Sequence, residues 1–354
     1  MKVLFYINAI HHGGAERVMV NLANMLSFDS RNSVVLVTSF KDEWEYNVYE
    51  LVKRINLVEN MPSGFIKRNT DLCKRLRRVL KDENPDTIVS FMAEPNFRLL
   101  ISSWGIKAKT IISIRNDPNR EYPNRLFKFL AKTLYRRADR VVFQTSEAQA
   151  WFPLKIQSKS EIIMNQVDEK FYGMERDESP RDIITTGRLV SQKNHEMLIR
   201  AFALISDNIK ENLIIYGEGD LREHLQSLIS ELNLENRVFL PGATTDVLKV
   251  LKSAKLFVLS SDYEGMPNSL MEALAVGVPS ISTDCPCGGP RELISHGVNG
   301  FLVPVNDIDA MAKMMQHLLD IPEEQLKAVS ENALKKANEF KPDVIFEEWK
   351  KIIL

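Results

Sequence analysis

Short apolar runs alternate along the chain with longer amphipathic segments. In the first half, β-rich runs are separated by helical patterns such as residues 16–26 and 72–81. This order is typical of parallel sheets that carry helices on both faces. The strands predicted in this half are Lys2–Ile7, Ser33–Ser39, Asp86–Phe91, Lys109–Ile114 and Arg140–Gln144.

The periodicity breaks at residues 173–181, a charged stretch without apolar spacing, and then restarts. A last amphipathic helix, Asp343–Leu354, follows Pro342. The pattern predicts an α/β protein of two Rossmann-like domains, residues 1–172 and 173–339, with residues 340–354 as a terminal helix. Strands are expected at Asp182–Thr186, Asn212–Tyr216, Arg237–Leu240, Leu256–Ser260, Pro279–Thr283 and Gly300–Val303.

Residues 263–279 combine a strand exit, a predicted helix start and two carboxylates. Pro267 and Asn268 open the helix and Gly277 ends it. Backbone N–H groups at the helix start, together with its dipole, are suited to a phosphate. Glu264 precedes the helix and Glu272 lies in its second turn, so the pair could bind hydroxyls on either side of a phosphate. The residues expected around that phosphate are Gly265, Met266, Pro267, Asn268 and Ser269.

A second loop, residues 186–194, follows the first strand of the second domain. Gly187 permits a tight exit from the strand, Arg188 offers a planar fork of donors and Lys193 a point charge. Two cations in an exposed loop could bind a diphosphate, or they could simply be solvated. Because ligands of such sheets bind beyond the carboxyl ends of the strands, we favour the diphosphate.

Two loops of the first domain also follow predicted strands. Gly13 and Gly14 form a turn that a ligand could approach closely. This turn lacks the Gly-x-Gly-x-x-Gly pattern, so we do not expect a dinucleotide there. Arg115, Asn116 and Asp117 come after another strand and could bind an acceptor. For Asp117, a turn-forming role before proline is an equal alternative.

The charge distribution is uneven although the net charge is −1. Residues 1–173 contain 27 Lys and Arg against 19 Asp and Glu, and the remainder is acidic. Two predicted helices hold much of the basic charge. Their apolar residues could face the core beneath a solvated basic face, or the helices could rest on anionic lipid. The basic residues are Lys67, Arg68, Lys74, Arg75, Arg77, Arg78 and Lys81, then Arg125, Lys128, Lys132, Arg136, Arg137 and Arg140.

Composition narrows the class of protein further. The chain has 354 residues, of which 44% are hydrophobic and 26% charged, as in globular proteins with sizeable cores. Three cysteines offer no disulfide framework, and the first apolar run is too short for a signal or a membrane span. We expect a cytoplasmic protein, peripheral at most to the inner face of the cell membrane, with no nucleic-acid partner.

The loop at 187–194 and the two glutamates resemble the signature of the retaining glycosyltransferases of family 4, which have the GT-B fold. That resemblance implies that Arg188 and Lys193 bind the donor diphosphate, Glu264 the donor sugar and Glu272 the ribose. It also implies that the terminal helix crosses back to the first domain. The catalytic set is then Arg188, Lys193 and Glu264, and further donor contacts come from Gly14, Gly187, Gly217 and Gly242; Gly13 and residues 115–117 would contact the acceptor.

The resemblance implies transfer of a hexose or N-acetylhexosamine from a nucleoside diphosphate sugar to a glycan acceptor. Residues 285–292 are similar to a variant found in enzymes of bacterial surface polysaccharide and lipid-linked oligosaccharide assembly. This favours a polyprenyl-linked acceptor and UDP as the nucleotide. The two cations could stabilise the leaving diphosphate, so we expect neither a metal nor a cofactor.

Other interpretations remain. A glycan-binding protein without turnover would need Arg188, Lys193 or Glu264 to be missing, and all three are present. An epimerase of the same fold would need acid and base residues around the sugar. Asp307 and Asp309 match a metal-binding Asp-x-Asp, although their position before an apolar helix predicts an N-cap. The histidines, His11, His12, His195, His224, His296 and His317, show no metal-ligand spacing.

Overall fold

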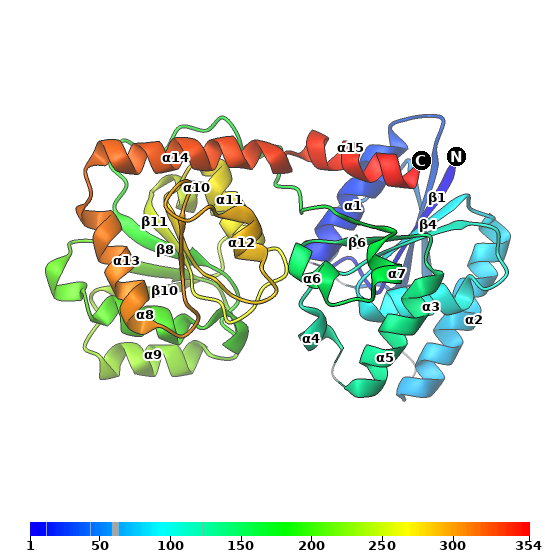
Figure 1. The fold of residues 1–354 in the computed structure, drawn as a ribbon, viewed down its shortest axis with the longest axis horizontal. Helices are drawn as coiled ribbons and strands as arrows, with labels where there is room; N and C mark the ends of the chain where they lie inside the picture. Colours follow the sequence, from blue (N-terminus) through cyan, green and yellow to red (C-terminus); the bar gives the residue numbers. More distant parts are fainter. Residues whose placement is uncertain (12, 43, 59–63, 123) are drawn as a thin grey trace. The chain divides into compact units, whose positions relative to one another are not determined.

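A computed structural model describes residues 1–354 except 12, 43, 59–63 and 123. The chain divides into two compact units, which we describe separately. Unit 1 contains Met1–Asn165 and Ile345–Leu354, and unit 2 contains Gln166–Val344. Each unit is a parallel sheet with helices packed against it (Figure 1). The α/β fold class with two Rossmann-like halves is therefore confirmed.

Unit 1 contains a seven-stranded parallel sheet in the order β3-β2-β1-β4-β5-β6-β7 among the described residues. The chain leaves β1 first on one side and later on the other, so the switch point lies between β1 and β4. The strands are β1 (Lys2–Ile7), β2 (Ser33–Phe40), β3 (Val52–Val58), β4 (Thr87–Phe91), β5 (Lys109–Ser113), β6 (Arg140–Phe143) and β7 (Ser160–Ile162).

Helices cover this sheet, and the C-terminal helix packs on it as well. Trp349 is fully buried, with its ring centroid 5.2 Å from that of Phe91 at the end of β4. The Thr87 hydroxyl donates to the Ile353 carbonyl at 3.0 Å. The helices are α1 (Gly14–Ser27), α2 (Phe65–Glu83), α3 (Ala93–Ser102), α4 (Pro118–Glu121), α5 (Arg125–Leu134), α6 (Ser146–Ala150), α7 (Leu154–Gln157) and α15 (Pro342–Ile353).

Unit 2 contains a six-stranded parallel sheet in the order β10-β9-β8-β11-β12-β13 among the described residues. Its first strand, β8, is central, and the chain builds outward from it on both sides. The switch point therefore lies between β8 and β11. The strands are β8 (Asp182–Thr186), β9 (Leu213–Tyr216), β10 (Val238–Gly242), β11 (Ala254–Leu259), β12 (Ser280–Thr283) and β13 (Phe301–Val303).

The core of unit 2 forms where amphipathic helices bury their apolar stripes on this sheet. Leu198 and Phe202 come from α8, Leu225 from α9, and Met311 and Met315 from α13. Each such buried side chain contributes about 1.5–3 kcal/mol of transfer free energy. The helices are α8 (His195–Ala203), α9 (Arg222–Glu231), α10 (Val247–Lys252), α11 (Asn268–Val276), α12 (Gly289–Leu293), α13 (Ile308–Asp320) and α14 (Glu323–Ala337).

Two strands of unit 1 were absent from the sequence prediction. In β3, charged and polar residues interrupt the apolar ones, and β7 has a single apolar residue. Both are edge strands, which bury less of each face and so need fewer apolar residues. The other strands begin and end within two residues of their predicted bounds.

Candidate active site

Two of the predicted loops meet at the switch point of the unit 2 sheet. Strands β8 and β11 pair side by side, so the loops at their carboxyl ends, residues 187–194 and 260–267, adjoin each other. The Asp262 N–H donates to the Gln192 carbonyl at 2.9 Å, and the Ser260 hydroxyl donates to the Lys193 carbonyl at 2.9 Å. The structure therefore brings the loop that contains both cations beside the loop that contains Glu264.

Lys193 and Glu264 form an ion pair at this point. The Lys193 Nζ lies 2.6 Å from Glu264 Oε1, and the two side chains are 14% and 8% exposed. The same oxygen accepts the Ser261 hydroxyl at 2.7 Å, while Oε2 faces the Gln192 amide at 3.5 Å. A charged pair this far from water depends on such additional hydrogen bonds. The expectation of an exposed loop is therefore wrong for Lys193, whose charge is neutralised within the protein.

The Glu264 backbone is fixed from a third loop. Its N–H donates to the Pro286 carbonyl at 2.7 Å, and its carbonyl accepts from the Cys287 N–H at 2.9 Å. Residues 286 and 287 follow β12, the next strand along the sheet. Glu264 is thus held by the loops after three adjacent strands, which leaves it little freedom to move.

Arg188 differs from Lys193 because it is exposed. Among the described residues its guanidinium has no hydrogen-bond or ion-pair partner, so its donors are available. Its backbone is fixed: Leu189, which is buried, donates its N–H to the Glu218 carbonyl at 2.9 Å. The loop therefore contains one exposed cation without a partner in the described part of the chain, Arg188, and one paired cation, Lys193.

His195 supports this loop and was not singled out from the sequence. Its Nε2 lies 3.2 Å from the Arg188 carbonyl, and burial lowers the pKa of the imidazole to about 4. The ring is then neutral at pH 7 and donates from Nε2, while the buried Nδ1 has no partner among the described residues. Its position directly after Lys193 and Asn194 is the one sequence signal that could have identified it.

The glycines predicted to contact the donor have packing roles in this structure. A Cβ on Gly217 would lie 1.8 Å from the Gly187 carbonyl oxygen, so the strand ends approach too closely for any side chain. Gly242 has a φ of +97°, and a Cβ there would come 2.8 Å from the Glu218 carboxylate. Gly187 donates its N–H to the Tyr216 carbonyl at 2.9 Å. The contacts at Gly217 and Gly242 explain those two glycines without a ligand, whereas a Cβ on Gly187 would come no closer than 3.4 Å to Lys193.

Helix α11 begins and ends where the sequence predicts. Pro267 is its N-cap, no side chain caps its first turn, and Gly277 ends it with a φ of +74°. Gly265, Met266 and Pro267 are buried, and Asn268 and Ser269 are partly exposed. Glu272 is buried in the second turn. The first turn of α11 contains no acidic residue, so the helix itself places no carboxylate at the positive end of its dipole.

Gly13 and Gly14 were expected to form a turn that a ligand could approach closely, and the structure differs at Gly13. The Glu16 carboxylate lies over Gly13, where a Cβ would come 2.1 Å from Oε2. The space beside Gly13 is therefore occupied by its own helix, α1, and Gly14 is the first residue of that helix. His11 lies 3.6 Å from the same carboxylate, and His12 is outside the described residues.

The loop after β5 holds two of its three predicted acceptor residues inside unit 1. Arg115 is buried with its guanidinium 4.6 Å from the Phe91 ring centroid and bonded to Asn165, and burial lowers its pKa to about 9. Asp117 is buried and caps α4, accepting the Asn119 N–H at 2.8 Å. Only Asn116 has an exposed side chain.

Glu121, at the end of α4, is a second group that sequence reasoning missed. Its Oε1 accepts the Ala93 N–H at 2.7 Å at the start of α3, and its buried Oε2 has no partner among the described residues. Burial of the carboxylate, opposed by that hydrogen bond, raises its pKa to about 7. A lone glutamate before a tyrosine gives no sequence signal for this.

Acidic side chains elsewhere in unit 2 have ordinary structural roles. The predicted N-cap at Asp307 is confirmed, because its carboxylate accepts the Ala310 N–H at 2.8 Å. Within the described part of the chain, no group of three His, Cys, Asp or Glu side chains could hold a metal ion. A cavity of about 640 Å³, lined by residues 174–178, by Pro180 and by residues of α13 and α14, contains none of the predicted site residues.

Comparison of the sequence with known proteins identifies the family of this chain. The model described as "Glycosyltransferase Family 4" matches residues 12–171, and that described as "Glycosyl transferases group 1" matches residues 167–336. An N-acetylgalactosamine-N,N'-diacetylbacillosaminyl-diphospho-undecaprenol 4-alpha-N-acetylgalactosaminyltransferase of Campylobacter jejuni is 30% identical over 94% of both chains.

Two further matches span the whole chain. A GalNAc-alpha-(1->4)-GalNAc-alpha-(1->3)-diNAcBac-PP-undecaprenol alpha-1,4-N-acetyl-D-galactosaminyltransferase of C. jejuni is 28% identical, covering 100% of this chain and 98% of its own. Anabaena HepE in complex with UDP and glucose superposes with a TM-score of 0.81 at 20% identity, covering 99% of this chain and 98% of its own. The chain thus has the GT-B fold and belongs to the glycosyltransferases of family 4.

Proposed function

We propose that this glycosyltransferase is retaining and metal-independent, and that it moves a hexose or N-acetylhexosamine from a UDP sugar to a saccharide carried on a polyprenyl diphosphate. The C. jejuni relative is named for transfer in an alpha linkage to a diphospho-undecaprenol saccharide. HepE binds UDP and glucose in its crystal structure. These names support a polyprenyl-diphosphate saccharide as the acceptor and UDP as the nucleotide of the donor. The reaction would serve bacterial surface polysaccharide or oligosaccharide assembly at the cytoplasmic face of the membrane.

The observation that supports the proposal most is the Lys193–Glu264 pair of 2.6 Å at the switch point, with exposed Arg188 in the same loop. A diphosphate entering there would meet one free guanidinium, one ammonium and the start of α11. All three stabilise negative charge, which grows on the diphosphate as the anomeric carbon departs. The Arg188 guanidinium, the Lys193 N–H donors that Glu264 does not use and the start of α11 could therefore supply the charge stabilisation that a metal ion supplies in other transferases.

The two glutamates would orient the donor. With Oε1 of Glu264 held by Lys193 and Ser261, Oε2 would be the atom that accepts a sugar hydroxyl. Glu272, one turn into α11, would accept the ribose hydroxyls. The backbone at Gly14, Gly187, Gly217 and Gly242 and at residues 265–269 would line the donor, while Asn116, the exposed residue of the loop 115–117, would contact the acceptor.

The bond changes balance without a further reactant. The bond between the anomeric carbon and the diphosphate oxygen breaks, and the acceptor hydroxyl forms the new glycosidic bond on the same face. The hydroxyl proton passes to the departing diphosphate, which leaves as UDP. A diphosphate is a weak base, so its departure needs no protein acid, and neither glutamate has to donate a proton.

The test is incubation of the purified protein with a panel of UDP sugars and synthetic polyprenyl-diphosphate saccharides, with and without chelator. We expect transfer that survives the chelator and a product whose anomeric configuration, read by NMR, equals that of the donor. Transfer that requires a divalent cation would contradict the proposed metal independence. A product with the opposite anomeric configuration would contradict the proposed retaining reaction. A free, epimerised sugar would replace the proposal with an epimerase.

A further inference from the structure

The starts of α2 and α5 expose a group of large apolar side chains in unit 1, which we call the apolar edge. Its members are between 38% and 80% exposed, although each is large enough to belong in a core. Scattered exposed apolar residues are normal, but a contiguous group marks an interaction surface. The apolar edge consists of Phe65, Ile66, Leu126, Phe129 and Leu130.

Aromatic packing brings the two helix starts together. The rings of Phe65 on α2 and Phe127 on α5 meet edge to face, 6.3 Å apart, and Phe127 also packs on Phe97 of α3. Figure 1 shows both helices beginning at the same end of unit 1. Leu126 and Leu130 flank Phe127 on α5, so the exposed side chains of both helices lie along one edge.

The two helices use their apolar residues differently. In α2, Leu72, Leu76 and Leu80 are fully buried, which confirms a core-facing stripe for that helix. In α5, Ala131 is the only buried residue, and Leu126 and Leu130 are exposed. A core-facing stripe is therefore wrong for these two residues. The reason is that α5 packs on unit 1 mainly through Phe127 and Ala131, which lie on the adjoining strip of the helix surface.

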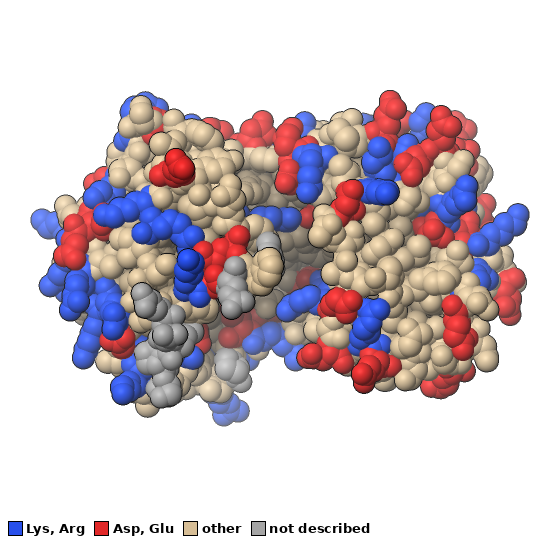
Figure 2. All heavy atoms as spheres, turned by 180° about the vertical axis from the view of Figure 1, so that it is seen from behind, with Lys and Arg blue, Asp and Glu red and all other residues tan. Residues whose placement is uncertain are grey.

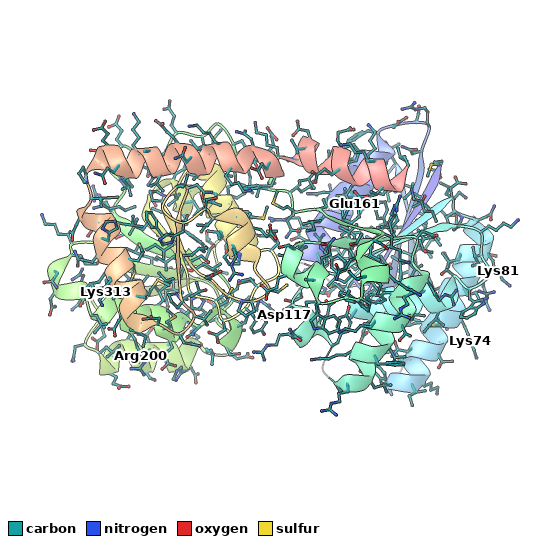
Figure 3. The ribbon with its side chains drawn as sticks, in the orientation of Figure 1. Lys74, Lys81, Asp117, Glu161, Arg200 and Lys313 are labelled. Carbon is teal, nitrogen blue, oxygen red and sulfur yellow. The ribbon has the colours of Figure 1, made fainter. Side chains whose placement is uncertain are left out.

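Cations border the apolar edge, and α5 contains no acidic residue. Lys67, Arg125 and Lys128 flank it, and the first acidic residue of α2, Asp71, is paired with Arg75 at 2.8 Å. Lys74 and Lys81 continue along the outer side of α2, and basic side chains gather at this margin of unit 1 (Figures 2 and 3). Apolar side chains bordered by cations match a membrane surface that contains anionic lipid.

We propose that the apolar edge inserts into an anionic membrane and holds unit 1 at the surface where a lipid-linked acceptor lies. The choice of a lipid surface rests on the proposed function. No helix among the described residues is long and apolar enough to cross a membrane. Helix α5 begins a few residues after α4, so the loop after β5, with the predicted acceptor residues, adjoins the inserted segment.

Vesicle sedimentation tests this surface with the full chain. Wild-type protein should sediment with vesicles of phosphatidylcholine and phosphatidylglycerol, and less with phosphatidylcholine alone. Ile66→Ser with Phe129→Ser should weaken binding to the mixed vesicles on the order of tenfold or more. Lys67→Ser with Lys128→Ser should reduce binding to the mixed vesicles and leave binding to phosphatidylcholine vesicles unchanged. Arg77 is unsuitable for this test, because it donates to the Ser102 and Trp104 carbonyls and its loss would disturb packing.

Leu154→Ser is the matched control, since Leu154 is exposed on α7, away from the starts of α2 and α5 (Figure 1). It should bind like wild type. Wild-type binding by the Ile66 and Phe129 double variant would overturn the proposal. So would an absence of vesicle binding combined with a dimer that this variant dissociates, because the edge would then join two copies.

The proposed function and the proposed membrane surface can be tested independently of each other. Edge variants should keep transfer to a short-tailed, water-soluble acceptor and lose it selectively for an acceptor embedded in vesicles. If wild-type protein transfers to neither acceptor, the proposed function is wrong, and the sedimentation series still decides the membrane surface.

Discussion

The carboxyl edges of the two sheets carry charged residues of the same types but use them differently. At the unit 2 edge, Lys193 and Glu264 form a pair, and Arg188, in the same loop as Lys193, has no side-chain partner among the described residues. At the unit 1 edge, Arg115 packs on Phe91, and Asp117 caps a helix. A polar residue after a strand is therefore a candidate for ligand binding only when the fold leaves some of its donors or acceptors unused. By that criterion the unit 2 edge is the better prepared of the two.

Lys193→Ala should have the largest effect, because it removes a cation from the diphosphate site and leaves Glu264 buried without its partner. We expect transfer to fall on the order of 10³-fold and the free energy of unfolding to fall by about 3 kcal/mol. Initial rates and urea denaturation measure the two effects.

A double variant separates them. Lys193→Met with Glu264→Gln removes both charges together and should recover most of the lost stability while transfer remains low. Unchanged stability in Lys193→Ala would mean that the pair does not hold the unit 2 edge together.

Arg188→Ala should lower transfer by about the same factor, on the order of 10³-fold, with stability within about 0.5 kcal/mol of wild type. The side chain is exposed, so its removal creates neither a cavity nor an unpaired charge. UDP affinity by calorimetry should fall as well.

The control for Arg188 is Arg200→Ala, an arginine of α8 that pairs with Glu196 at 2.9 Å (Figure 3). It should change transfer little and stability by a few tenths of a kcal/mol. Wild-type UDP affinity in Arg188→Ala would remove this residue from the diphosphate site.

The raised pKa of Glu121 predicts that the stability of unit 1 depends on pH. Its folded pKa of about 7 lies above the ordinary value of 4.5, so its contribution to stability is full below pH 4.5. That contribution is lost as the pH rises through 7, on the order of 3 kcal/mol in all. Glu121→Gln, which keeps an acceptor for the Ala93 N–H, should lose this dependence. Urea midpoints at pH 5 and pH 8 measure it, and an equal difference between wild type and variant at both values would contradict it.

Substitutions of Asp117 should show the smallest effect, and they distinguish a role as N-cap of α4 from a role in binding the acceptor. As an N-cap it contributes about 1 kcal/mol, so Asp117→Ala should lose that amount, and Asp117→Asn should retain the cap. If capping is its whole role, Asp117→Asn transfers like wild type. A rise of KM for the acceptor in Asp117→Asn, with stability unchanged, would instead assign the carboxylate to the acceptor hydroxyl.

Local signals were sufficient for much of the fold. Central strands are buried on both faces, so continuous apolar runs such as the one in Lys2–Ile7 identify them. Proline and glycine at 267 and 277 fix the two ends of α11, because one is suited to a helix start and the other to a left-handed C-cap. Edge strands β3 and β7 escaped prediction, since an edge needs few apolar residues.

The site was predictable as a set of loops but not as a set of contacts. Arg188, Lys193 and Glu264 follow strands, and the topology of a doubly wound sheet is enough to place such residues at one edge. Nothing local indicates that Lys193 is paired and Arg188 is not. Nor could periodicity show which apolar residues of α5 are covered, because that depends on Phe65 and Phe97 from elsewhere in the chain.

The sequence by itself determined the class of fold, the strand and helix order and the loops that carry the chemistry, because these follow from periodicity and from residues with fixed backbone preferences. Only the tertiary structure decided which charges are neutralised, that the pKa of Glu121 is raised to about 7 and which apolar side chains stay exposed. Those properties depend on distance and on exclusion of water, which are set by segments far apart in the chain.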